Sequence, residues 1–93
     1  MTKKDILELL KELIINHDRP RLKLEYSDVH LDATLMDLGF DSLDLTELAV
    51  NIENKLDIHI KDSEVENIIM KLDIEGLMNF LHQRYKETRE QEM

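Results

Sequence analysis

The sequence predicts an all-α fold: a small bundle of four helices, three long and one short, with a long loop after the first. Three observations support this class. The chain has 93 residues, the length of a single domain. It contains only two glycines and one proline, so few positions suit tight hairpin turns. Apolar residues recur at helical spacing in four segments, which are rich in leucine, lysine and glutamate.

The first expected helix covers residues 3–15. Its apolar residues recur at i, i+3, i+4, i+7 and i+8, which places them on one helical face. These residues are Ile6, Leu9, Leu10, Leu13 and Ile14. The sequence Asn16-His17-Asp18 is turn-prone, and Pro20 prevents the helix from continuing.

Residues 16–40 are expected to form a long connection, with one short helical turn near Ser27 and Asp28. A structureless loop of this length is uncommon in a compact domain, so its own apolar residues should pin it to the core. They are Leu22, Leu24, Val29, Leu31, Leu35, Met36 and Leu38. The alternation in LKLEY would fit a strand, but no partner strand is near, and no strand is predicted.

The second expected helix, residues 42–56, has the clearest boundaries. Gly39 marks a turn before it, and Asp41 is a suitable N-cap because its carboxylate can accept from free backbone N–H groups. Asp44 adds an acid in the first turn, where the helix dipole favours it. The predicted buried stripe is Leu45, Leu48, Ala49, Ile52 and Leu56.

Two further helices complete the predicted bundle. The short one covers residues 62–69, capped by Asp62 or Ser63, with Val65, Ile68 and Ile69 facing inward. The long one covers residues 74–86, with Asp73 as its cap. Its inward residues are Ile74, Leu77, Met78, Leu81 and Tyr85. Residues 1–86 are therefore predicted to be one domain, and residues 87–93 a polar, frayed tail.

The composition excludes several classes of protein. The net charge is −9, from 21 acidic and 12 basic residues, which disfavours nucleic acid and anionic membranes and favours basic protein partners. The absence of cysteine excludes disulfides, zinc–thiolate sites and a cysteine nucleophile. Charged residues interrupt the apolar run at the N-terminus, unlike a signal peptide, and no apolar stretch approaches the roughly 20 residues of a membrane span. We expect a cytoplasmic protein that is a monomer, because nothing in the pattern requires an oligomer.

The residues give little indication of catalysis. The histidines, at positions 17, 30, 59 and 82, fall in different predicted elements without metal-ligand spacing, so they are expected at the surface or its boundary, with no metal bound. Ser27, Ser42 and Ser63 have no neighbouring histidine–acid arrangement. The sequence therefore favours a non-catalytic protein over a small hydrolase.

Two features of the second helix have more than one interpretation. Ser42 lies in the first turn, where free N–H groups suit a phosphate, but serine is also common there as part of a cap. Opposite the buried stripe lie Leu43, Thr46, Glu47, Val50 and Asn54, with Asp44 and Glu53 at the margins. An apolar centre with an acidic rim fits a docking surface for a basic partner. A solvated face with two ordinary exposed hydrophobic residues would show the same pattern.

The segment DLGFDSLDLTEL, residues 37–48, resembles the attachment site of acyl carrier proteins and related carrier domains. The signature of that family, Asp-Ser-Leu after a Leu-Gly pair, stands here as Leu38-Gly39-Phe40-Asp41-Ser42-Leu43. The similarity continues through ELAVNIENKLDIHI, residues 47–60, and most of residues 3–85 fit the family pattern.

The resemblance implies a four-helix carrier fold and a function. Ser42, flanked by Asp41 and Leu43, would receive 4′-phosphopantetheine from coenzyme A through a phosphopantetheinyl transferase. The thiol of this arm would hold acyl groups as thioesters for enzymes of fatty-acid, lipid or polyketide-like biosynthesis. The family docks the acids of this helix onto basic patches of the transferase and synthase enzymes. The matching residues here are Asp41, Leu43, Asp44, Thr46, Glu47, Val50 and Glu53.

Four departures from the family pattern suggest a specialised carrier. Phe40 stands where a small residue is usual, Thr46 replaces an apolar docking residue, and Lys61 replaces a proline. The stretch IIMKLD, residues 68–73, is longer than the common pattern. A D-alanyl carrier, a peptidyl carrier and an unmodified acidic helical adaptor remain the alternatives.

Overall fold

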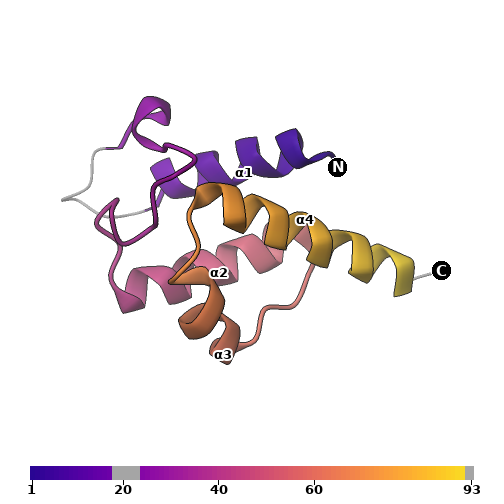
Figure 1. Ribbon diagram of the computed structural model, residues 1–93. Helices are drawn as coiled ribbons and strands as arrows, with labels where there is room; N and C mark the ends of the chain where they lie inside the picture. Colours follow the sequence, from indigo (N-terminus) through magenta and orange to yellow (C-terminus); the bar gives the residue numbers. More distant parts are fainter. Residues whose placement is uncertain (18–23, 92–93) are drawn as a thin grey trace.

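The computed structural model describes residues 1–17 and 24–91 (Figure 1). Its elements in order are α1 (Lys3–Ile15), η1 (Tyr26–Asp28), α2 (Ser42–Leu56), α3 (Asp62–Glu64), η2 (Val65–Ile69) and α4 (Ile74–Gln91). Within the described residues there is no strand, and the one isolated bridge joins Thr34 to Asp73. The all-α prediction is confirmed, with three long helices and a short helical segment between α2 and α4.

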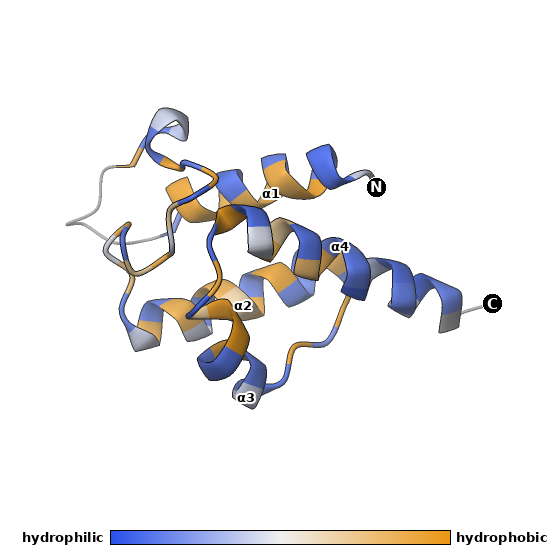
Figure 2. Ribbon diagram, in the orientation of Figure 1, coloured by the Kyte–Doolittle hydropathy of each residue, from blue (hydrophilic) through white to orange (hydrophobic). Residues whose placement is uncertain are grey.

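The three long helices share one apolar core. Helix α1 packs against both α4 and α2, and η2 packs against α2. The apolar sides of these helices face one another and the charged sides face outward (Figure 2). The residues at the centre are at most 1% exposed: Ile6, Leu10, Ile14, Leu45, Leu48, Ile52, Ile74, Leu77 and Leu81. Burial of each such side chain contributes about 1.5–3 kcal/mol of hydrophobic free energy. The apolar stripes predicted for these helices therefore provide most of the stabilisation of the fold.

The loop between α1 and α2 is held partly as predicted. Val29 and Leu35 are buried, and Leu24 and Leu38 pack against the core. The expected helical turn is present as η1. The prediction is wrong for Leu31 and Met36, which are 42% and 57% exposed, and Leu22 lies outside the described residues.

Backbone hydrogen bonds replace some of the expected apolar anchors of this loop. The N–H of Ile74 donates to the Ala33 carbonyl at 2.9 Å, and the N–H of Glu75 donates to the Leu31 carbonyl at 3.0 Å. Both donors belong to the first turn of α4, where helix geometry leaves N–H groups without an intrahelical partner. The loop carbonyls therefore accept hydrogen bonds from the free N–H groups at the start of α4. Leu31 is held in place by its main chain rather than by its side chain.

The short helical segment covers residues 62–69 as predicted, but its start and its form differ. The N-cap is Lys61, whose N–H donates to Glu64 Oε1 at 3.0 Å, and not Asp62 or Ser63. Asp62 and Ser63 lie inside the first turn because the Glu64 carboxylate reaches back to satisfy the backbone before it. The second half, η2, is a π-helix, in which the N–H of Met70 donates to the Val65 carbonyl at 3.0 Å.

Helix α4 begins as predicted and ends later. Asp73 Oδ1 accepts from the Gly76 N–H at 2.8 Å, which confirms the expected cap. The predicted end at residue 86 is wrong, because the helix continues to Gln91, so residues 87–91 are helical rather than frayed. Arg89 explains the extension: its guanidinium donates to the Leu56 carbonyl at 3.0 Å and lies 4.5 Å from the centre of the Tyr85 ring. None of the described helices is long and apolar enough to span a membrane.

An ion pair joins the short helical segment to α4. Arg84 Nη1 donates to Glu64 Oε1 at 3.1 Å and to the His59 carbonyl at 2.7 Å. The hydrogen bond from Arg84, followed by the one from the Lys61 backbone, lowers the pKa of Glu64 from 4.5 to about 2. The ionised form of Glu64 is therefore favoured by folding.

Glu64→Gln should change how the unfolding free energy depends on pH in the acidic range. Because folding depresses the pKa of Glu64, its contribution is complete above its unfolded value of 4.5 and is lost as the pH falls towards 2. The wild type should therefore lose more unfolding free energy than the variant over this acidic range. Urea denaturation at a series of pH values measures the difference. Glu66→Gln, at an exposed neighbouring site, is the control and should follow the wild type. Parallel curves for the wild type and Glu64→Gln would contradict the prediction.

Candidate functional site

The N-terminus of α2 is closed by two carboxylates that cap each other. Asp41 Oδ1 accepts from the Asp44 N–H, and Asp44 Oδ2 accepts from the Asp41 N–H, both at 2.9 Å. Asp41 itself is extended, and its carbonyl accepts the first helical bond, from Leu45, at 3.0 Å. The prediction of Asp41 as N-cap is confirmed, and the reciprocal bonds fix the backbone on both sides of Ser42.

The chain reaches this cap through a sharp turn. Gly39 has a φ of 94°, a conformation in which a side chain would be strained. The N–H of Gly39 donates to the Met36 carbonyl at 3.0 Å, and the N–H of Phe40 donates to the Leu35 carbonyl at 3.1 Å. The Phe40 side chain is buried, at 3% exposed. The turn therefore sends Phe40 into the core immediately before Asp41 and Ser42 emerge at the surface.

Ser42 is exposed and is the first residue of α2. It borders a pocket of about 250 Å³ between α2 and the α3–η2 segment, whose other lining residues are Leu45, Thr46, Val65, Glu66 and Met70. The Thr46 hydroxyl donates to the Ser42 carbonyl at 3.1 Å. The N-terminal end of a helix favours a phosphate through its free N–H groups and its dipole. Position 42 thus combines an accessible serine, a helix terminus and an adjoining pocket.

Asp44 does not lie at the exposed margin where the sequence placed it. It is 1% exposed, and it is the buried charged residue among those the structure describes. One of its oxygens accepts from Asp41, and the other is 3.1 Å from His17 Nε2. The expectation that Asp44 is exposed on the docking face is wrong, because its carboxylate faces the end of α1 rather than solvent.

His17 lies at the boundary of the protein, as expected, but its side chain faces inward. Its side chain is 3% exposed, and its Nε2 is 3.7 Å from Glu47 Oε2 as well as close to Asp44. The ligand atoms of these three side chains lie within 4.8 Å of one another, so they form one histidine–carboxylate group that the sequence did not reveal. The hydrogen bond to Asp44 accounts for this arrangement, and no metal site is assigned to it.

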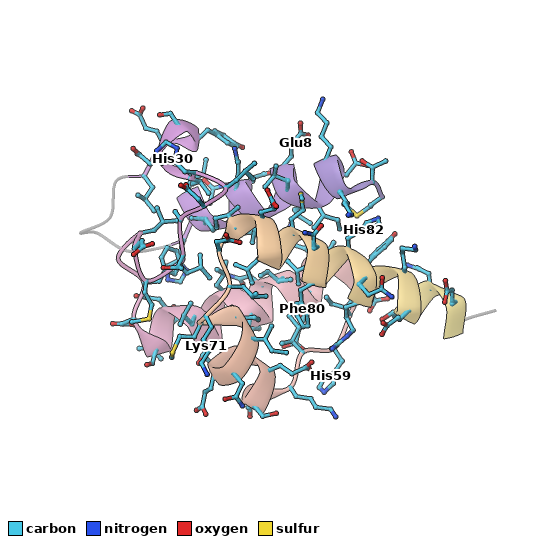
Figure 3. The ribbon with its side chains drawn as sticks, in the orientation of Figure 1. Glu8, His30, His59, Lys71, Phe80 and His82 are labelled. Atoms are coloured by element: carbon cyan, nitrogen blue, oxygen red, sulfur yellow. The ribbon has the colours of Figure 1, made fainter. Side chains whose placement is uncertain are left out.

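The other histidines lie in separate parts of the molecule (Figure 3). His30 is in the loop before α2, His59 precedes α3, and His82 is on α4. His30 and His59 are exposed, and His82 is half-buried, which agrees with the sequence expectation.

The outer face of α2 presents an apolar pair beside an acid. Leu43 and Val50 are 65% and 49% exposed, and the Glu47 side chain is 55% exposed. With Thr46, which is also exposed, they occupy positions i, i+3, i+4 and i+7 and so share one face. Large exposed aliphatic side chains next to acids are a feature of interaction surfaces.

Glu53 contributes less to this face than the sequence suggested. Its side chain is 26% exposed, and its Oε2 accepts from the Ile60 N–H at 3.3 Å and lies 3.4 Å from His59 Nδ1. Glu53 therefore holds the loop that follows α2, and it lies at the edge of the exposed face.

Comparison with known proteins identifies the family. The family model described as "Phosphopantetheine attachment site" matches residues 19–68, which is more than half of the chain. The acyl carrier protein of Exiguobacterium sibiricum is 39% identical over 69 residues, 73% of this chain and 82% of that protein. The acyl carrier protein of Petrotoga mobilis is 33% identical over 85 residues, 90% of this chain and 92% of that protein. The chain belongs to the acyl carrier protein family.

Membership fixes the class of function. Acyl carrier proteins are non-catalytic carriers, and their cofactor is phosphopantetheine. The cofactor supplies a thiol that holds an acyl group as a thioester, which this cysteine-free chain cannot do itself. The residues fit such a group: an exposed serine stands at the N-terminus of α2, where a phosphodiester is favoured, with open space beside it.

Replacing the N-cap should separate its hydrogen-bonding role from its charge. Asp41→Ala removes the acceptor of the Asp44 N–H and should lower the unfolding free energy by about 1 kcal/mol. Asp41→Asn keeps an acceptor oxygen and should lose less than half as much. Urea denaturation of both variants measures the two losses. Equal losses of unfolding free energy in the two variants would show that Asp41 stabilises the protein through its charge and not through its hydrogen bond.

Proposed function

We propose that Ser42 carries the 4′-phosphopantetheine arm, and that the protein shuttles acyl groups as thioesters between enzymes of fatty-acid, lipid or polyketide-like biosynthesis. The observation that carries this proposal is the place of Ser42: an exposed serine at the first position of α2, within the matched segment. Its neighbours Asp41 and Leu43 flank the attachment point at the surface.

Attachment needs a separate transferase and a balanced exchange of bonds. Ser42 Oγ forms a bond to the phosphorus that carries pantetheine in coenzyme A. The bond from that phosphorus to the 3′,5′-ADP portion breaks, and the hydroxyl proton passes to a base on the transferase. The described part of this chain requires no catalytic residue for this step, because its contribution is to present the hydroxyl.

The exposed face of α2 is proposed to dock those enzymes. Leu43 and Val50 provide apolar contact, and Asp41 and Glu47 provide negative charge at its rim. An overall charge of −9 steers the carrier towards basic patches on the transferase and on synthases. Thr46 lies within this face, and Glu53 lies at its edge with much of its carboxylate engaged elsewhere.

The pocket beside Ser42 is proposed to shelter part of the carried chain. Leu45, Val65 and Met70 give it an apolar wall, and an apolar chain laid against them would leave water. The buried Phe40, where the family pattern has a small residue, supports a specialised member of the family. So does the stretch at residues 68–73, which is longer than that pattern.

Modification of Ser42 can be tested directly by mass. Incubation with coenzyme A, magnesium and a broad-range phosphopantetheinyl transferase should add one phosphopantetheine, measured by intact mass spectrometry. Ser42→Ala should show no addition, because it lacks the oxygen that forms the phosphodiester. Ser63→Ala, which removes another exposed hydroxyl, is the matched control and should be modified fully.

The result also separates the rival functions. No modification of the wild type, under conditions that modify a control carrier, would favour an unmodified acidic adaptor. Mass analysis of the cargo on protein from its native cells would distinguish acyl groups from D-alanyl and peptidyl groups.

Charge reversal on the docking face should weaken the encounter with the transferase. Glu47→Lys should lower kcat/KM for loading roughly fivefold at low salt, because it places a positive charge opposite a basic patch. The deficit should shrink as salt is raised, since exposed charges are screened. Glu8→Lys is the matched control: Glu8 is exposed on α1 and points away from α2 (Figure 3). An equal effect of both substitutions would mean that only net charge matters.

A further inference from the structure

His17 joins the end of α1 to the first turn of α2 from inside the protein. It stands after the last residue of α1, and its side chain is 3% exposed. Its Nε2 lies 3.1 Å from Asp44 Oδ1, and that carboxylate is 2% exposed. A carboxylate removed from water is strongly destabilising unless donors surround it, so His17 supplies a contact that the start of α2 needs.

The same histidine also contacts the residue before the cap. The centres of the His17 and Phe40 rings are 5.0 Å apart, with an angle of 34° between the rings. Phe40 is followed directly by Asp41, whose N–H donates to the second oxygen of Asp44 at 2.9 Å. His17 therefore holds the Phe40–Asp41 turn at one end through its ring and at the other end through Asp44.

We infer that His17 is a positioning residue for modification of Ser42, acting through Asp44 and Phe40. Ser42 lies between the two capping residues, so its hydroxyl can be presented in one place only while both are fixed. This inference rests on the proposed function, because it concerns how the attachment serine is offered to a transferase. It also gives Phe40 a purpose: the large ring in the motif is the surface on which His17 packs.

Misplacing the Ser42 hydroxyl should lower the rate of its modification strongly, because it must meet the reacting phosphorus in the docked complex. A displacement near 1 Å in a docked complex can cost on the order of 100-fold in rate. The proposed docking side chains Leu43, Glu47 and Val50 are exposed and are not themselves replaced, so we expect the variants still to bind the transferase. Loss of the His17 contact should therefore lower kcat for loading with little change in KM. General destabilisation differs, because it reduces the amount of folded substrate and so raises the apparent KM.

Two substitutions separate the two contacts of His17. His17→Gln keeps an N–H donor beside Asp44 but loses the ring, and His17→Phe keeps a ring beside Phe40 but loses the donor. His30→Gln, at an exposed site in the loop, is the matched control. Phe40→Leu removes the ring contact while leaving His17 in place. If His17→Phe does not fold, Phe40→Leu and His17→Gln still test the inference.

Loading kinetics and amide hydrogen exchange give the two readouts on the full chain. In His17→Phe, exchange of the Asp41 and Asp44 amide protons should accelerate about tenfold more than that of the Leu77 and Leu81 amides in α4. Its loading kcat should fall about tenfold, and His17→Gln should recover most of that loss. Phe40→Leu should show a smaller loss in kcat, and His30→Gln should match the wild type.

Two results would overturn the inference while leaving the proposed function intact. One is normal loading kcat in both His17→Phe and Phe40→Leu. The other is exchange that rises equally at the cap and in α4, with the loading defect confined to KM. Failure of the proposed function looks different, because then neither the wild type nor any variant is loaded by a transferase that modifies a control carrier.

Discussion

One buried carboxylate organises the start of α2. Asp44 is 1% exposed, and a charge so far from water is tolerated only when donors satisfy it. Its two oxygens accept from the Asp41 backbone and face His17, so the N-terminal cap and the end of α1 meet at a single side chain. The exposed serine between Asp41 and Asp44 thus stands on a fixed base, although it is itself at the surface.

The acids of α2 consequently divide into two kinds. Asp44 is buried, and Glu53 accepts a hydrogen bond from the Ile60 N–H in the loop after the helix. Glu47, beside Leu43 and Val50, is exposed to solvent. A large negative net charge therefore does not make every acid of the helix a docking residue, since burial decides which of them a partner can reach.

Periodicity explains what the sequence could predict. The stripes of α1, α2 and α4, the caps at Asp41 and Asp73 and the exposure of Ser42 follow from local spacing and motif. The His17–Asp44 contact could not be predicted this way, because it joins residues 27 positions apart and neither lies in a pattern that points to the other. The extension of α4 to Gln91 was missed for the same reason: Arg89 reaches the end of α2, which only the folded chain brings near.

Two surfaces meet at Ser42, and their arrangement fits the role proposed for this serine, in which it would serve both cargo and enzymes. On one side, the pocket shared with η2 places Val65 and Met70 beside the serine. On the other, Leu43 and Glu47 begin the exposed face of α2. A group attached here can lie against the protein or extend towards a docked partner by turning about one point. That choice would be useful only if the point itself did not move. Under the proposed function, the reciprocal cap and its histidine support would therefore belong to the function as much as to the fold.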